Sequence, residues 1–331
     1  MTSMWRVLSQ HVLISEGSIC VLLNALLFSL VWSREMRGTW MAYKLAITIS
    51  ACHGITMGIL IVIGQFTHIF SDSFFIIICY GPFVYLSESW QRFLLRLACI
   101  ACYTIYQFIP APCLLQYLVL CHRRMDRSLR LLISYGYVSI LIAVTFVLST
   151  DFVPRTRQFA SRLRSTAMRV QELDVLRDDF AVNGVGIFPD EANEGHNILL
   201  IAFGGIVPTY MAAYGVFAWT VWRIWQTLKS TGIQLSARTM QMQRQFIKNQ
   251  ILQGLIPFVG INVPMSIFLY GIITAQNIDN WTLTLPFTLW ALPAVQALVY
   301  LNFCRNSIKS RMQTSGATTV VSVSAVTRKQ T

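Results

Sequence analysis

Charged residues are scarce in this chain. Of its 331 residues, 12% are charged and 55% are hydrophobic, and the mean hydropathy is +0.55. A soluble domain carries about 25% charged residues, so this chain has too little charge to cover a surface that faces water. The shortage excludes an ordinary soluble protein and indicates that lipid replaces water over much of the exterior.

Clusters of metal ligands and of catalytic groups are lacking as well. The eight cysteines are scattered, with no CxxC…CxxC pair and no Cys/His cluster of zinc spacing. The apolar runs contain no HxxxH, no HExxH and no pair of aspartates. We therefore predict no catalytic residue, no metal and no cofactor, which argues against a membrane hydrolase or another enzyme. No small-residue cleavage pattern follows the first apolar stretch, which predicts an uncleaved anchor.

Long apolar runs are abundant instead. A helix needs about 20 mostly apolar residues to cross the hydrocarbon core, because its backbone groups cannot stay unpaired in lipid. The runs predict seven transmembrane helices at 11–33, 45–67, 93–121, 130–149, 197–222, 248–274 and 284–303. The expected fold class is an all-α membrane protein, a seven-transmembrane-helix bundle over residues 1–310.

The basic residues predict the orientation of this bundle. Lysine and arginine gather after the first, third, fifth and seventh runs, whereas the short segments on the other side hold only Arg6. Loops rich in these residues stay in the cytosol, so the N-terminus is predicted outside and the C-terminus inside. The formal net charge of +12 then reflects topology and contact with anionic lipids, and no nucleic acid is expected.

Two segments outside the runs have their own character. Residues 150–196 form a long loop that mixes acids with arginines, and the apolar residues between Arg157 and Asp179 roughly fit an amphipathic helix. We predict that this loop forms an extracellular lid over the outer mouth of the bundle; the alternative is a solvated loop.

Residues 311–331 are rich in Ser and Thr and predict a disordered cytosolic tail. Asn280 begins an N-glycosylation sequon on the predicted outer side.

Polar and aromatic residues near the outer side are the candidates for a ligand site. Arg92 and Arg96 lie one helical turn apart, and they would either meet an anionic ligand or pair with acids of the outer loop. The pocket is predicted between the outer halves of the third, fifth, sixth and seventh runs. Its candidate residues are Arg96, Tyr103, Tyr106, Gln107, Tyr270 and Trp290. An aromatic pocket with few polar groups suits a small, fairly apolar molecule.

The inner face carries a second candidate site. Prolines within the runs permit kinks, and movement at the foot of the sixth run would open a cleft for a partner helix. The basic residues expected to contact this partner are His122, Arg123, Arg124, Arg238 and Lys248. For any one of these arginines, topology alone is the alternative explanation.

Four local patterns, in this order and spacing, resemble a known family. They are Asn24 in Leu22-Leu23-Asn24-Ala25-Leu26-Leu27 followed by Tyr43-Lys44; Tyr80-Gly81-Pro82 with Tyr85; Arg123; and Ser236-Ala237-Arg238-Thr239 through Gln243, Gln245, Lys248 and Gln253 to Pro257 and Pro264. The set resembles the nematode serpentine chemoreceptors of the str superfamily, most closely their class delta.

The resemblance implies a G-protein-coupled receptor in the plasma membrane of sensory cilia, which detects an odorant or pheromone-like ligand. The implied partners are a small-molecule ligand, a heterotrimeric G protein and membrane lipids. The chain departs from related patterns in three places. No acid precedes Arg123; residues 150–196 lack cysteine, so Cys79 is expected to stay free; and Gln296 follows Pro293 where an acid is often found.

Two other functions remain as alternatives. An odorant-gated ion channel with inverted topology would also have seven spans, but its N-terminus would lie inside, against the distribution of basic residues. A membrane transporter would be expected to show an internal repeat that pairs broken helices, and we find none.

Overall fold

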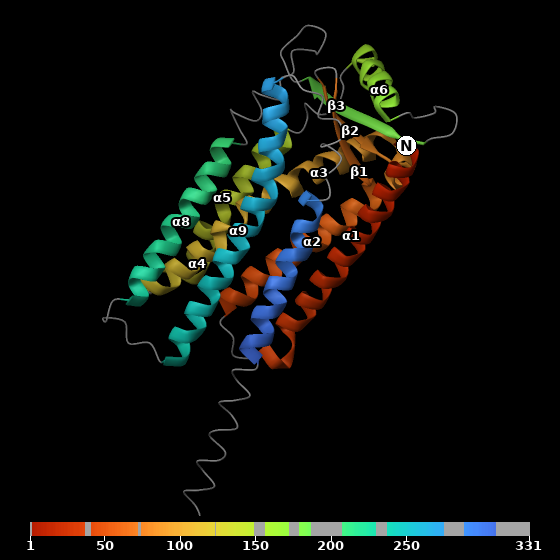
Figure 1. The fold of residues 1–331 in the computed structure, drawn as a ribbon. Coiled ribbons are helices and arrows are strands. Elements are labelled where there is room, and N and C mark those ends of the chain that lie inside the picture. Colours follow the sequence, from red (N-terminus) through yellow and green to blue (C-terminus); the bar gives the residue numbers. More distant parts are fainter. Residues whose placement is uncertain are drawn as a thin grey trace, which may run out of the picture.

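The computed structural model describes residues 2–36, 41–71, 74–122, 124–148, 156–171, 179–186, 207–229, 237–274 and 288–308. Within these residues, seven helical columns lie side by side (Figure 1). They are α1 (Thr2–Trp32), α2 (Met41–Gly64), the bent pair α3 (Glu88–Gln107) and α4 (Pro110–Cys121), α5 (Arg127–Leu148), α8 (Val207–Lys229), α9 (Ala237–Thr274) and the C-terminal helix (residues 288–308). Two short 3-10 turns are η1 (Arg34–Met36) and η2 (Pro82–Tyr85).

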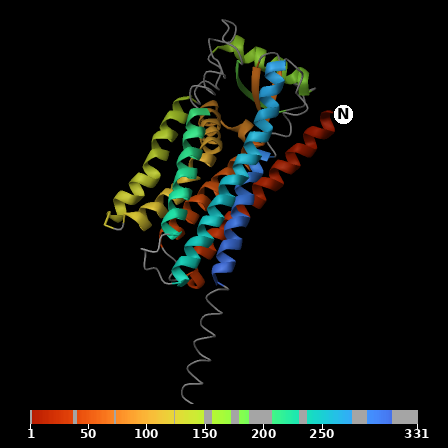
Figure 2. The ribbon, with the colours of Figure 1, turned by 60° about the vertical axis from the view of Figure 1, so that its left-hand side comes forward.

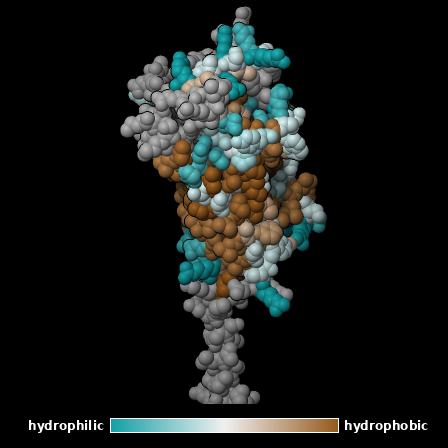
Figure 3. All heavy atoms as spheres, turned by 90° about the vertical axis from the view of Figure 1, so that its right-hand side faces the viewer, coloured by the Kyte–Doolittle hydropathy of each residue, from teal (hydrophilic) through white to brown (hydrophobic). Residues whose placement is uncertain are grey.

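The outer surface of the columns is apolar. Among the described helices, Val7–Trp32, Tyr43–Gly64 and Arg127–Val147 are long and apolar enough to cross a membrane, and the α3–α4 pair is a fourth if it counts as one span. Leu22, Leu132 and Ile140 each expose about two thirds of their side chains. On the face drawn in Figure 3, hydrophobic residues cover much of the middle, with hydrophilic residues toward both ends. Such a surface suits lipid rather than water.

A small antiparallel sheet lies at one end of the bundle, which we call the sheet end (Figures 1 and 2). It is made of β1 (Phe66–Ser71), β2 (Phe74–Cys79) and β3 (Ala181–Gly186), in the order β1-β2-β3. Helix α6 (Arg157–Gln171) packs on the sheet, in the segment where an amphipathic helix was expected. The pairing of β3 with β2 ties the segment between α5 and α8 to the end of the bundle.

Strand β2 is apolar at every position because both of its faces are covered. Ile76 and Ile78 pack under Phe159 and Leu163 of α6, whereas Ile77 faces the core of the bundle. Side chains alternate between the two faces of a strand, and a strand buried on both faces reads as a continuous hydrophobic run.

Burial also lowers the pKa of the neighbouring His68 in β1 to about 4, so its ring is neutral at physiological pH.

The structure differs from the sequence prediction at this end. The second run was expected to remain helical to residue 67, but α2 ends at Gly64 and Gln65 has a positive φ of 45°. Residue 66 already belongs to β1, and no strand was predicted. Apolar content alone cannot separate a buried strand from a buried helix. Residues 197–206 and 284–287 of the fifth and seventh runs lie outside the described residues.

Helices α1 and α2 pack closely through glycines. A Cβ atom on Gly58 would lie 2.7 Å from the carbonyl oxygen of Gly17, and one on Gly54 would lie 2.4 Å from the side-chain amide of Asn24. Gly54 and Gly58 are four residues apart, the spacing that brings membrane helices together. Asn24 also donates to the backbone oxygen of Pro293 at 3.4 Å, so this contact reaches the C-terminal helix.

The α1–α2 contact predicts a stability difference between two glycine variants. Gly54→Ala should destabilise the folded protein by about 1–3 kcal/mol, because the new methyl group overpacks against Asn24. Gly215→Ala in α8 is the matched control, since nothing lies within 4 Å of its Cβ position. Thermal unfolding of the purified protein in detergent measures the difference. Equal melting temperatures for the two variants would contradict this packing.

Candidate functional site

The third column is bent where α3 meets α4. The chain bends by 42° between the two helices, and Pro110 and Pro112 follow the break. Proline has no amide hydrogen and its ring clashes with the preceding turn, so the backbone near the break needs another partner. The Tyr137 hydroxyl of α5 donates to the carbonyl oxygen of Gln107 at 2.6 Å. A neighbouring helix therefore satisfies the backbone of the bend, as the bilayer interior requires.

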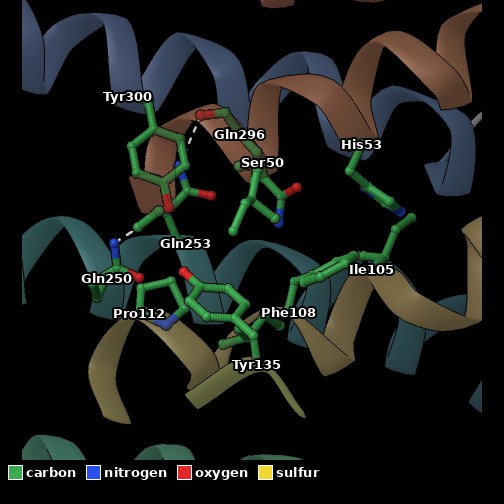
Figure 4. A pocket seen from close by; sticks show the side chains of 13 residues that line it. Ser50, His53, Ile105, Phe108, Pro112, Tyr135, Gln250, Gln253, Gln296 and Tyr300 are labelled. Carbon is green, nitrogen blue, oxygen red and sulfur yellow. Dashed lines mark hydrogen bonds between the residues drawn. The ribbon is translucent and has the colours of Figure 1, made fainter. Parts of the chain in front are cut away.

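A polar cavity of about 30 Å³ lies beside this bend (Figure 4). Five of the seven columns contribute to its wall. The lining residues are Ala46, Ile49, Ser50 and His53 of α2, Ile105, Phe108, Ile109 and Pro112 of the bent pair, Tyr135 of α5, Gln250 and Gln253 of α9, and Gln296 and Tyr300 of the C-terminal helix. The volume suits one or two water molecules. It is far below the roughly 300 Å³ of a small-molecule pocket.

Hydrogen bonds around the cavity join neighbouring columns. The Nε2 atom of His53 lies 2.9 Å from the carbonyl oxygen of Ala101 and 3.3 Å from Oγ1 of Thr104. A carbonyl oxygen can only accept, so His53 donates from Nε2 to Ala101. On the other wall, Gln253 donates to the backbone oxygen of Gln296 at 2.7 Å. The cavity is therefore a polar junction of α2, α3, α9 and the C-terminal helix.

Three glutamines on one face of α9 extend these contacts away from the sheet end. We call Gln243, Gln250 and Gln253 the glutamine row. Gln250 donates to the Tyr300 hydroxyl at 3.3 Å, and Gln243 accepts from Gln116 of α4. Hydrogen bonds between membrane helices contribute about 0.6 kcal/mol each on average, and at most about 1.7. The row therefore holds α9 by contacts that a modest free energy can break.

One part of the predicted ligand site is assembled between α3, α8 and α9. We call Tyr103, Tyr106, Tyr210 and Tyr214 the tyrosine cluster. The ring of Tyr106 lies 5.1 Å from those of both Tyr103 and Tyr210, measured between centroids. The Tyr103 hydroxyl forms a hydrogen bond with the Thr209 hydroxyl of α8. The Tyr214 hydroxyl donates to the carbonyl oxygen of Gly254 at 3.0 Å. A change in the cluster would therefore act directly on the backbone of α9.

The remaining predicted ligand residues lie elsewhere. Gln107 is buried at the bend, and Trp290 is buried against Phe66 beneath the sheet, with ring centroids 5.7 Å apart. Arg96 lies over the Phe146 ring of α5 at 5.4 Å, and Tyr270 exposes 59% of its surface. None of the six candidates is among the residues that line the cavity beside the bend.

The neighbouring Arg92 was expected to meet a ligand or an acid of the outer loop. It forms an ion pair with Glu88, one turn earlier in its own helix. An ion pair of this kind can be predicted from the sequence, because side chains four residues apart lie next to each other on a helix.

The candidates for the inner face lie at the end opposite the sheet. His122, Arg124 and Lys248 are exposed there, with the His122 ring 5.6 Å from that of Tyr117. Arg238 lies in the first turn of α9, and its side chain is not among those described. Arg123 and Asn280 lie outside the described residues.

This end is closed by packing between α4, α8 and α9. Its apolar contacts are made by Tyr117, Leu118 and Leu120 of α4, Ile224 and Leu228 of α8, and Ile247 of α9. The Sγ atom of Cys121 and Oγ1 of Thr227 lie 3.4 Å apart at its rim. A partner helix could enter here only after α9 moves away from α4 and α8.

The bend predicts unequal effects of two tyrosine substitutions in α5. Tyr137→Phe leaves the buried carbonyl of Gln107 without its partner and should cost about 1–3 kcal/mol of folding free energy. Tyr135→Phe is the matched control, because among the described residues its hydroxyl has no hydrogen-bond partner. Melting temperatures of the two purified variants test this, and a larger loss for Tyr135→Phe would refute the role given to Tyr137.

Comparison with known proteins agrees with this architecture. Residues 9–306 match the family described as serpentine type 7TM GPCR chemoreceptor Str. The match begins within α1 and ends within the C-terminal helix, so it covers all seven columns. A search of curated proteins found no match. The resemblance to the str-type receptors is confirmed, while the narrower placement in class delta stays a prediction. The chain belongs to the Str family of serpentine seven-transmembrane G-protein-coupled chemoreceptors.

Proposed function

We propose that this chemoreceptor binds a small odorant or pheromone-like molecule and activates a heterotrimeric G protein from the plasma membrane of a sensory cilium. Membership of the Str family supports the receptor role, and counts against the odorant-gated channel and the transporter. The observation that carries the mechanism is the attachment of α9. The tyrosine cluster contacts this helix at Gly254, and the glutamine row holds it from the adjacent Gln253 toward the end opposite the sheet.

The ligand binds at the tyrosine cluster in this proposal. The cluster offers ring faces and hydroxyl groups, which suit a small apolar molecule with one or two polar atoms. Tyr103 and Tyr106 are only 7% and 4% exposed, so a ligand must displace ring contacts to enter. Of the residues predicted from the sequence, Tyr103 and Tyr106 belong to this cluster, and Gln107 follows Tyr106 at the bend. Arg96, Tyr270 and Trp290 lie apart from it.

Movement of α9 passes the signal to the other end. Displacing Tyr214 loosens its hydrogen bond to Gly254, and α9 is then held by the glutamine row and by its apolar packing. If the row breaks, the foot of α9 can leave α4 and α8 and open a cleft between them. His122, Arg123, Arg124, Arg238 and Lys248 surround this cleft by their place in the chain, and a helix of the G protein enters it.

The glutamine row predicts a change in signalling without any ligand. Gln243→Leu removes the hydrogen bond from Gln116 and should raise basal signalling about three- to tenfold, the range that corresponds to about 0.6–1.4 kcal/mol. A second-messenger assay in a heterologous cell, normalised to surface expression, measures this. Gln241→Leu is the matched control, since Gln241 is exposed on the same helix. Basal signals that do not differ between the variants would remove the row from the mechanism.

The ligand site is tested by a pair of tyrosine variants. With an agonist found by screening, Tyr106→Leu should raise the half-maximal concentration at least tenfold, because it removes the central ring of the cluster. Tyr270→Leu should leave the concentration within about twofold, since this side chain points outward and is 59% exposed. The reverse pattern would place the ligand near the end of α9 and outside the cluster.

The proposed orientation predicts which terminus is accessible. The basic residues at the end opposite the sheet indicate that this end faces the cytosol. An epitope tag before Met4 should therefore bind antibody on unpermeabilised cells, while a tag at the C-terminus should bind only after permeabilisation. A hidden N-terminal tag beside an accessible C-terminal one would support the inverted topology of the channel alternative.

A further inference from the structure

A second hollow lies between α2, α4 and α5 at the end opposite the sheet, and we call it the basal groove. Its volume is about 360 Å³. It is lined by Met41 and Leu45 of α2, Leu115 and Val119 of α4, and Arg127, Arg130 and Leu131 of α5. Five of these side chains are apolar, so the groove combines a hydrocarbon wall with two guanidinium groups.

Positive charge is concentrated around the arginines of the groove. Residues 124–130 contain three arginines, Arg124, Arg127 and Arg130, and one carboxylate, Asp126. Arg127 begins α5, and Arg130 lies one turn later. The N-terminus of a helix carries a partial positive charge of its own, which disfavours nearby cations and favours an anion. The charges of the helix end and of the arginines therefore attract the same kind of ligand.

The groove lies at the level of the lipid headgroups. At the same end of the bundle, Trp32, Trp222 and Trp225 are 41–54% exposed, and tryptophan favours the membrane–water interface. Lys44 lies 5.6 Å over the Trp32 ring and Lys229 lies 5.5 Å over the Trp225 ring, which places cations at this depth too. A molecule in the groove would meet hydrocarbon on one side and the headgroup layer on the other.

We propose that the basal groove binds one anionic phospholipid. Its phosphate lies between Arg127 and Arg130, since guanidinium groups bind phosphate through paired hydrogen bonds. Its acyl chain runs along Leu45, Leu115 and Val119. A soluble anion would leave this apolar wall unused, and a lipid without net negative charge would leave the positive charge of the two arginines and the helix end uncompensated. In the orientation proposed above, the lipid belongs to the cytosolic leaflet, where anionic lipids are concentrated.

Binding is measured by native mass spectrometry of the full-length receptor in detergent, titrated with phosphatidylserine, phosphatidylcholine or glycerophosphoserine. We expect the first phosphatidylserine to bind at least tenfold more tightly than phosphatidylcholine. Glycerophosphoserine has the same headgroup without acyl chains and should bind far more weakly. The double variant Arg127→Gln/Arg130→Gln should lose at least tenfold in affinity for phosphatidylserine. Val119→Trp, which fills the groove without changing the charge, should lose a similar amount.

The control removes the same charge from the same end of the bundle. Arg223→Gln/Arg305→Gln alters two exposed arginines outside the groove and should keep phosphatidylserine affinity within about twofold. An equal loss in the control would show diffuse attraction to the basic end and overturn the proposal. Equal binding of phosphatidylcholine would indicate a neutral lipid, and tight binding of glycerophosphoserine a soluble anion. If the arginine variant does not fold, Val119→Trp carries the test, and unchanged binding in it refutes the groove.

Discussion

The bilayer leaves no water for an unpaired backbone group, and the bend of the third column shows how this receptor meets that constraint. Proline breaks the helix between α3 and α4, and the Tyr137 hydroxyl of a neighbouring column compensates the Gln107 carbonyl. The break leaves a small polar cavity around which four helices exchange hydrogen bonds. The irregular part of the backbone thus becomes the point where α2, α3, α9 and the C-terminal helix meet. Any rearrangement of the bundle has to pass through this junction.

Helix α9 is attached in a way that suits a switch. Transfer of apolar surface from lipid into a helix interface contributes little, because lipid chains are as apolar as leucine, so close packing and polar contacts decide which helices associate. The glutamine row and the Tyr214–Gly254 bond supply these contacts, each modest in free energy. A ligand shifts the position of α9 only by the difference between its binding free energies for the two positions. Micromolar affinity corresponds to about 8 kcal/mol, so a ligand that binds mainly after α9 has moved can outweigh these contacts.

Much of the bundle could be predicted from the sequence, because seven apolar runs of sufficient length allow few other folds in lipid. The sheet could not, because Phe74–Cys79 is as apolar as a buried helix and its partner β3 lies about a hundred residues away. That the three glutamines share one face of α9 could be predicted from the sequence, since residues three and seven apart lie on one face of a helix. The sequence could not show that Trp290 is buried beneath the sheet while Tyr270 points outward, because packing between distant segments decides both positions.

The way in which β3 and α6 are attached to the sheet end has a consequence for how the protein matures. All eight cysteines are free, so the backbone ladder between β2 and β3, and not a covalent bridge, fastens the segment between α5 and α8 to the bundle. The pairing of β2 with β3 forms without an oxidase, and a reductant such as dithiothreitol leaves this pairing intact. A ladder can also open and re-form one rung at a time, which a disulfide cannot do without thiol chemistry. The attachment of this segment is thus reversible, and its strength depends on strand pairing and on the packing of α6 against the sheet.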